Sequence, residues 1–114
     1  GIGQIFKYTP NQQDPNGSLE LVFEATTNGP IEKPDSLTTN QWGDLIICED
    51  NNLTKKCVIG LTPDGKLYSI ASTELSEWTG ACFSPDGKIL FVNIQENPGM
   101  TLGIQGPWEK LRAS

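Results

Sequence analysis

The feature that most restricts the fold of this chain is a turn that occurs twice. Residues 62–68 (TPDGKLY) and 84–90 (SPDGKIL) are near copies that lie 22 positions apart. Proline presets the backbone for a turn, aspartate bonds to nearby amides and glycine accepts a positive φ, so each copy predicts a hairpin. A second match relates residues 42–47 to residues 86–91, which lie 44 positions apart. The spacing indicates a repeating unit of two hairpins, or four strands.

The remaining segments show the pattern of short strands separated by turn-forming residues. Apolar and polar residues alternate over 4–8 and 19–23, a weaker strand covers 35–39, and apolar runs cover 45–48, 57–61 and 100–104. No stretch of ten or more residues has the 3.6-residue period of a helix. We therefore predict an all-β protein of antiparallel strands, with residues 109–114 as a polar, frayed tail that has room for a helical turn.

Four strands in about 40–50 residues form one blade of a β-propeller. Residues 1–108 are accordingly predicted to be a partial propeller: residues 3–25 are two outer strands of one blade, 33–72 a complete blade and 77–104 the inner part of the next. A propeller closes only with about four or more blades, so we expect a fragment of a larger protein. Its partner would be the remainder of the propeller, or a second copy that associates through exposed blade edges. The alternative fold is a β-sandwich with similar turns.

Composition excludes several classes of function. A net charge of −6 argues against nucleic-acid binding, and no apolar run approaches the length of a membrane helix. Histidine is absent and no Gly-rich phosphate loop is present, so catalysis by this chain alone is not expected. The three cysteines, Cys48, Cys57 and Cys82, fit no zinc spacing. Cys48 and Cys82 lie in apolar strand patterns and are predicted to be buried free thiols.

Candidate ligands follow from the propeller geometry, because inner strands begin at the mouth of the central channel. The polar residues just before the two predicted inner strands are Glu32, Lys33, Asp35, Glu74, Glu77 and Thr79. Carboxylates that meet there would suit a hard cation such as Ca²⁺, which takes six to eight oxygen ligands. The alternative is that they are solvated loop acids. We interpret Asp64 and Asp86 as turn residues.

The end of the second strand of the complete blade is less informative. Glu49 is a weaker metal-ligand candidate there, whereas Asp50 and Asn51 are interpreted as turn formers.

Several of these segments together resemble a known family. Residues 80–88 (GACFSPDGK), 90–95 (LFVNIQ), 98–99 (PG) and 106–108 (GPW) are similar to the C-terminal end of PhoX-type alkaline phosphatases. Residues 34–37 (PDSL), 45–50 (LIICED) and 60–65 (GLTPDG) are similar to the preceding blade of that family. The resemblance extends from about Gly3 to Trp108.

The resemblance implies a six-bladed propeller that hydrolyses phosphate monoesters with calcium and iron at the channel mouth. It also implies that Asp35 and Glu77 occupy calcium-ligand positions. The family's iron ligands and phosphate-binding arginine lie in blades outside this chain, and the cysteines here do not match the iron-ligand motif. The isolated chain is therefore expected to be inactive. A periplasmic or extracellular location is implied, although no signal segment is present here.

Two other functions stay open at this stage. The first is a non-catalytic propeller that binds a ligand or partner through its channel face. The second is a sugar-lactone hydrolase, a calcium-dependent propeller enzyme to which the sequence bears little resemblance. Cysteine and Arg-x-Glu motifs in upstream blades would favour the phosphatase.

Overall fold

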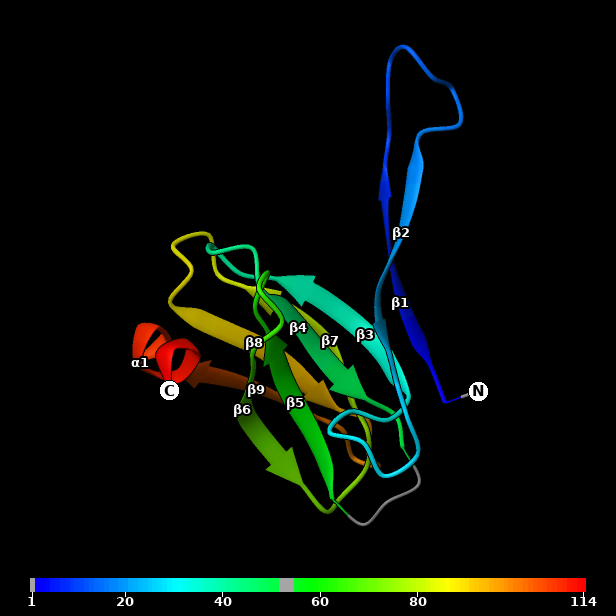
Figure 1. Cartoon of the computed structure of the whole chain (residues 1–114). Coiled ribbons are helices and arrows are strands. Elements are labelled where there is room, and N and C mark those ends of the chain that lie inside the picture. The colour runs from blue at the N-terminus through cyan, green and yellow to red at the C-terminus, as the bar shows by residue number, and fades with distance from the viewer. Residues whose placement is uncertain (1, 52–54) are drawn as a thin grey trace.

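The structure is a computed structural model that describes residues 2–51 and 55–114, and over these it has nine strands and one short helix. The strands are β1 (Gln4–Thr9), β2 (Ser18–Glu24), β3 (Pro34–Thr39), β4 (Leu45–Glu49), β5 (Lys56–Leu61), β6 (Leu67–Thr73), β7 (Trp78–Phe83), β8 (Ile89–Ile94) and β9 (Met100–Gln105), and the helix is α1 (Trp108–Ala113). They form three antiparallel sheets, β1-β2, β3-β4-β5-β6 and β7-β8-β9 (Figure 1). Strand order follows chain order in each sheet. The prediction of an all-β, antiparallel structure is confirmed.

Both copies of the repeated turn form the predicted hairpin connections. In the first, the Lys66 amide donates to the Thr62 hydroxyl at 2.9 Å, and Gly65 has a φ of 91°. In the second, the Ser84 hydroxyl donates to Asp86 at 2.7 Å, and Gly87 has a φ of 73°. Each loop thus satisfies its own polar groups and uses glycine where the backbone is left-handed, as local sequence alone predicts.

The four-stranded sheet β3–β6 is the middle layer of the molecule. Because side chains alternate along a strand, β4 directs Ile46 and Cys48 to one face and Ile47 to the other, and all three are fully buried. On one side the core is formed by Ile46, Cys48, Val58, Trp78, Leu90, Val92, Ile94 and Trp108. On the other it is formed by Ile5, Ile31, Ile47, Ile59 and Leu61. The β7–β9 sheet therefore packs on one face of β3–β6, whereas Ile5 is the one buried residue that the β1–β2 strands contribute to the core on the other face.

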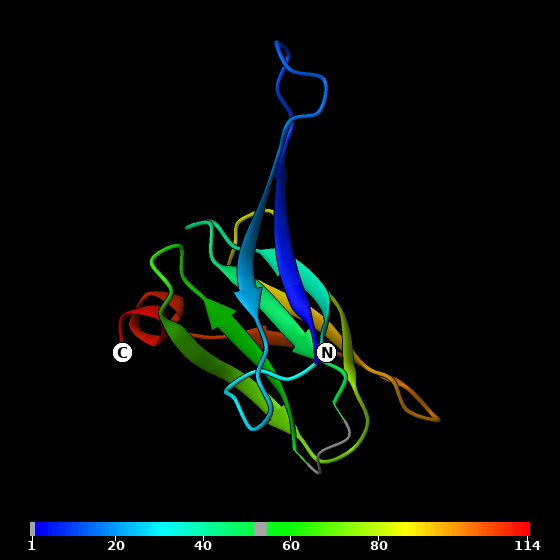
Figure 2. The same ribbon diagram turned by 45° about the vertical axis from the view of Figure 1, so that its right-hand side comes forward.

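The β1–β2 hairpin is mostly outside this core and extends away from the other two sheets (Figures 1 and 2). Only Ile5 in the hairpin strands is buried. Phe6 pairs with Leu21 and Tyr8 with Leu19 across the two strands, and these four side chains are 47–68% exposed. Since residues two apart on a strand share a face, the four form one exposed apolar surface.

The C-terminal residues form the helical turn for which the sequence had room, but this turn is packed against the rest of the protein instead of frayed. Residues 108–113 form helix α1, whose Trp108 is buried and donates its indole N–H to the Lys88 carbonyl at 2.8 Å. The Phe83 ring packs edge-on against Trp108, with ring centroids 5.5 Å apart. These contacts join residues that are far apart in the chain. They could not be predicted from the short polar sequence of the tail alone. No helix within residues 2–51 and 55–114 is long and apolar enough to cross a membrane.

The cysteines also depart in part from expectation. All three are free thiols, and Cys48 is buried as predicted. Cys82, however, is exposed and Cys57 is partly buried. The prediction for Cys82 was wrong because the β7 register directs Ala81 and Phe83 toward the core and Cys82 away from it.

Candidate metal centre

Three carboxylates from separate segments meet at one end of the β3–β6 sheet. Asp35 lies on β3, Asp50 directly follows β4 and Glu77 directly precedes β7. One carboxylate oxygen of each lies within 4.8 Å of the other two. Asp35 and Asp50 are exposed and Glu77 is partly buried. The two main sequence candidates, Asp35 and Glu77, thus lie together, and Asp50 joins them. We call these three residues the acidic cluster.

The pairing of β3 with β4 places the first two members of the cluster. The strands are antiparallel, so the start of β3 lies beside the end of β4, with Pro34 paired to Glu49. The ladder is irregular between Pro34 and Ser36, which leaves Asp35 as the extra residue of a bulge. Bulges redirect side chains and are common beside functional sites. The Asp50 amide donates to the Lys33 carbonyl at 3.0 Å, which fixes the chain just beyond β4.

The neighbouring sheet supplies the third member. Strand β7 lies next to β3, and the Gly80 amide donates to the Ser36 hydroxyl at 3.2 Å. The Glu77 carbonyl accepts a hydrogen bond of 3.0 Å from the Gln95 amide. The indole of Trp78 donates to the Lys56 carbonyl at 3.0 Å. The chain at Glu77 and at the residue that follows it is therefore anchored.

The electrostatics of the cluster match its geometry. The pKa of Glu77 is raised above its usual value by desolvation, then by the negative charges of Asp50 and Asp35 and a hydrogen bond with Asp50. Three carboxylates this close repel one another when ionised. A bound cation would remove that repulsion, whereas isolated acids on solvated loops would not experience it.

The weaker candidate, Glu49, lies outside the acidic cluster. Its side chain points into the protein and is 4% exposed. One carboxylate oxygen accepts from the Glu32 amide at 3.0 Å and the other from the Cys57 amide at 3.0 Å. Glu32 itself accepts a hydrogen bond from the Asn28 amide at 2.7 Å. Both of these acids are thus bonded to backbone groups.

Sequence reasoning assigned Asp50 to a turn and so missed it as a site residue. A signal was nevertheless present. In an antiparallel pair, the residue that follows the second strand lies beside the start of the first strand. Two acids at these two positions are therefore predicted to lie close together. Asp35 and Asp50 satisfy this condition.

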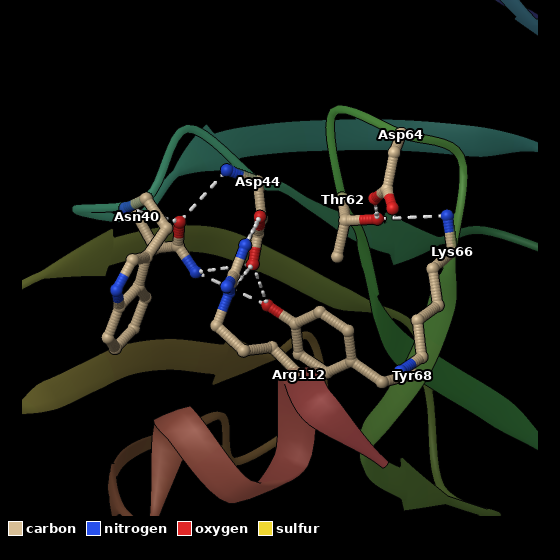
Figure 3. Close-up of polar contacts among 8 residues, drawn as sticks. Asn40, Asp44, Thr62, Asp64, Lys66, Tyr68 and Arg112 are labelled. Carbon is tan, nitrogen blue, oxygen red and sulfur yellow. Dashed lines mark hydrogen bonds and ion pairs between the residues drawn. The ribbon is translucent and has the colours of Figure 1, made fainter.

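A second polar network lies at the opposite end of β4, around the fully buried Asp44 (Figure 3). Arg112 binds its carboxylate at two points, with Nη2 2.8 Å from Oδ1 and Nε 2.9 Å from Oδ2. The Tyr68 hydroxyl and the Asn40 amide also donate to Oδ2, at 2.7 Å and 3.0 Å. The hydrogen bond from Arg112 is the main cause that lowers the pKa of Asp44 to about 2. Asp44 is fully buried and its two carboxylate oxygens accept four hydrogen bonds from side chains of the protein, so we assign the network a structural role.

The donor set of the acidic cluster fits a hard divalent cation. All its side chains are carboxylates, which Ca²⁺ prefers, and they project from three independent segments. It holds no cysteine, and the sequence contains no histidine, so it lacks the softer ligands typical of zinc or thiolate-bound iron. The residues therefore fit calcium and give no support to an iron site within this cluster.

Comparisons with known proteins add one finding to this geometry. A family model described as alkaline phosphatase PhoX matches residues 1–99 of the 114-residue chain. The matched region includes all three members of the acidic cluster. Searches of curated proteins and of solved structures gave no significant match.

Proposed function

Because the chain belongs to the PhoX alkaline phosphatase family, we propose that it supplies part of the active site of a metal-dependent phosphomonoesterase. The observation that carries this proposal is the acidic cluster of Asp35, Asp50 and Glu77. Family membership points to phosphatase chemistry, and the cluster is the place in this chain where oxygen ligands converge.

In this proposal the cluster binds Ca²⁺ through its carboxylate oxygens. A bound cation would neutralise phosphate charge and polarise the P–O bond. The chain's own contribution is to hold three negative groups against their mutual repulsion, on two adjacent strand ends and a bulge. Three residues supply only part of the six to eight oxygens that Ca²⁺ takes, so water, substrate or other parts of the protein complete the shell.

The sheet arrangement supports the proposal of a propeller, for which the family resemblance implies six blades. Residues 34–73 form one four-stranded antiparallel sheet whose strands follow in order, as in a propeller blade. The first strand of this sheet lies beside the first strand of the next, and the acidic cluster spans the two. In a propeller those strands line the channel, so the cluster would lie at its mouth.

The exposed surface of the β1–β2 hairpin supports a partner in the form of further propeller blades. Phe6, Tyr8, Leu19 and Leu21 form an apolar surface on a sheet of only two strands. Two strands alone are marginally stable in water, and sheets of this size gain stability by pairing and packing. Additional strands and a neighbouring sheet would cover both the edge and the face. Association with a second copy is the alternative occupant of this surface.

We further propose that the chain alone is inactive. Arginine is the side chain best suited to bind phosphate at two points, and the sequence contains a single arginine, Arg112. Arg112 is bound to Asp44 at the opposite end of β4 from the acidic cluster. A phosphate-binding arginine would therefore come from other blades. On the basis of family membership, we also propose a location in the periplasm or outside the cell.

Hydrolysis of p-nitrophenyl phosphate tests this function. The longest natural protein that contains this chain and the 114-residue chain are assayed side by side, with Ca²⁺ or with a chelator. We expect calcium-dependent turnover by the longer protein only, and its loss in Asp35→Asn and Glu77→Gln. Asp64→Asn, an exposed acid in a hairpin turn, is the control and should retain activity. A folded, calcium-loaded longer protein without turnover would replace this proposal with that of a non-catalytic binding propeller.

A further inference from the structure

Glu49 is a buried carboxylate that belongs neither to the acidic cluster nor to the polar network around Asp44. It is 4% exposed and lies directly before Asp50 in the sequence. We propose that Glu49 is a positioning residue that sets the geometry of the acidic cluster. This inference rests on the proposed metal-binding function.

The hydrogen bonds of Glu49 join the chain segments that carry the cluster. One oxygen accepts the amide of Glu32, three positions before Asp35, at 3.0 Å. The other accepts the amide of Cys57, the second residue of β5, also at 3.0 Å. The Glu49 side chain on β4 thereby holds two segments. One is the segment that leads into Asp35, and the other is the start of β5.

The segment held by Glu49 has an unusual backbone. Lys33, between Glu32 and the bulge at Asp35, is a non-glycine residue with a φ of 50°. Such conformations are unfavourable for a residue with a side chain and persist only where the surroundings enforce them. Here the Lys33 amide donates to the Ile2 carbonyl at 2.8 Å and its carbonyl accepts from Asp50 at 3.0 Å. With Glu49 holding the preceding amide, the chain is held on both sides of the turn into Asp35.

The second link reaches the Glu77 side of the cluster. Lys56 precedes Cys57, and its carbonyl accepts the indole N–H of Trp78, the residue after Glu77. The Cys57 amide held by Glu49 is therefore one residue from the anchor of Trp78. This series of bonds connects Glu49 to the backbone of all three cluster members while leaving their carboxylates available for a cation.

A carboxylate is required for this role because both oxygens must accept. The glutamine side chain has one acceptor oxygen and one NH₂ donor, so Glu49→Gln would direct a donor at an amide N–H. It would thus break one of the two links with almost no change in volume. Residues that orient metal ligands from behind typically change metal affinity by 10–100-fold when substituted.

The test uses Tb³⁺, a luminescent stand-in for Ca²⁺, bound to the 114-residue chain and excited through Trp78. We expect Glu49→Gln to weaken Tb³⁺ binding by about tenfold. Asp44→Asn is the matched control: it also neutralises a fully buried carboxylate, at the other end of β4. It should lower the melting temperature and leave Tb³⁺ affinity within about twofold of wild type. Equal affinities of the two variants would overturn the positioning role.

The same experiment separates this inference from the metal site itself. If Asp35→Asn weakens Tb³⁺ binding and Glu49→Gln does not, the site stands and the positioning role is wrong. If wild type binds no Tb³⁺, both fail.

A measurement on wild type covers the case in which Glu49→Gln does not fold. Coupling is reciprocal, so a metal that depends on the contacts of Glu49 must also stabilise them. Ca²⁺ should therefore slow hydrogen exchange at the Glu32 and Cys57 amides. Exchange at these amides that is unchanged by saturating Ca²⁺ would contradict the inference.

Discussion

Arg112 on the C-terminal helix binds Asp44, 68 positions earlier in the chain, through two hydrogen bonds of 2.8 Å and 2.9 Å. The Asp44 side chain is fully buried and that of Arg112 is 25% exposed. The guanidinium also lies over the ring of Trp42, 5.1 Å from its centroid. The last helix is thus fastened to the turn between β3 and β4, far from the acidic cluster.

This contact predicts a specific loss of stability in acid. The pKa of Asp44 falls from its usual 3.8 to about 2 in the folded protein, so the unfolded chain takes up the proton first. The stabilisation is complete above about pH 4 and is lost as the pH falls toward 2. Asp44→Asn should cost about 2–3 kcal/mol at pH 7, because the amide keeps only one acceptor oxygen for these donors and removes the charge that pairs with Arg112. Urea unfolding from pH 2 to 7 measures both effects, and the variant should show a flatter acid limb.

The acidic cluster predicts an effect of opposite sign. The pKa of Glu77 is raised above its usual 4.5 by desolvation and by the neighbouring acids, so ionised Glu77 destabilises the fold without a cation. In a chelator at pH 7, Glu77→Gln should therefore melt a few degrees higher than wild type. The difference should vanish below about pH 4, where the carboxyl is protonated in both states. With Ca²⁺ present the order should reverse. A variant that melts lower than wild type in chelator would contradict this.

The close approach of Gly60 to Tyr68 predicts a steric effect in the middle sheet. A Cβ on Gly60 would lie 2.5 Å from Cε1 and Cε2 of the Tyr68 ring. The ring cannot move freely, since it is buried and its hydroxyl donates to Asp44. Gly60→Ala should destabilise the protein by about 1–3 kcal/mol. Gly106→Ala, where a Cβ would meet nothing within 4 Å, is the control for thermal melting. Equal melting temperatures would show that the sheet absorbs the methyl group.

The three thiols should differ in reactivity. Cys82 is exposed, whereas burial raises the pKa of the Cys48 thiol to about 11. Burial also raises the pKa of Cys57, with a further contribution from Glu49. Because the thiolate is the reactive form, a disulfide reagent at pH 7.5 should label one thiol rapidly and Cys48 only on unfolding. Rapid labelling that persists in Cys82→Ser would show that a second thiol is accessible.

Local features of the fold could be predicted from sequence. The Pro-Asp-Gly hairpins follow from bonds between residues a few positions apart, and alternation located the strands. The same alternation contained a signal for Glu49 that was not used. It lies two positions from the buried Ile47, on the same face of β4, and so should point inward.

Contacts between distant segments could not be predicted in this way. Asp35 and Glu77 were flagged because each precedes a predicted inner strand. Asp50 was missed because an acid followed by asparagine is also the usual composition of a turn. The ion pair between Asp44 and Arg112 depends on how two sheets and a helix pack together. It cannot be predicted from the spacing of residues in the sequence. The same holds for the exposure of Cys82, which depends on the β7–β8 register.

The most direct test of the central claim is calorimetric titration of Ca²⁺ into the 114-residue chain at pH 7. Wild type should bind one Ca²⁺ per chain, and the double variant Asp35→Asn/Asp50→Asn should give no binding heat. The double variant Asp64→Asn/Asp86→Asn removes the same charge from two exposed hairpin turns and should bind as wild type does. Equal binding by the two double variants, or none by wild type, would contradict the assignment of the acidic cluster as a metal site.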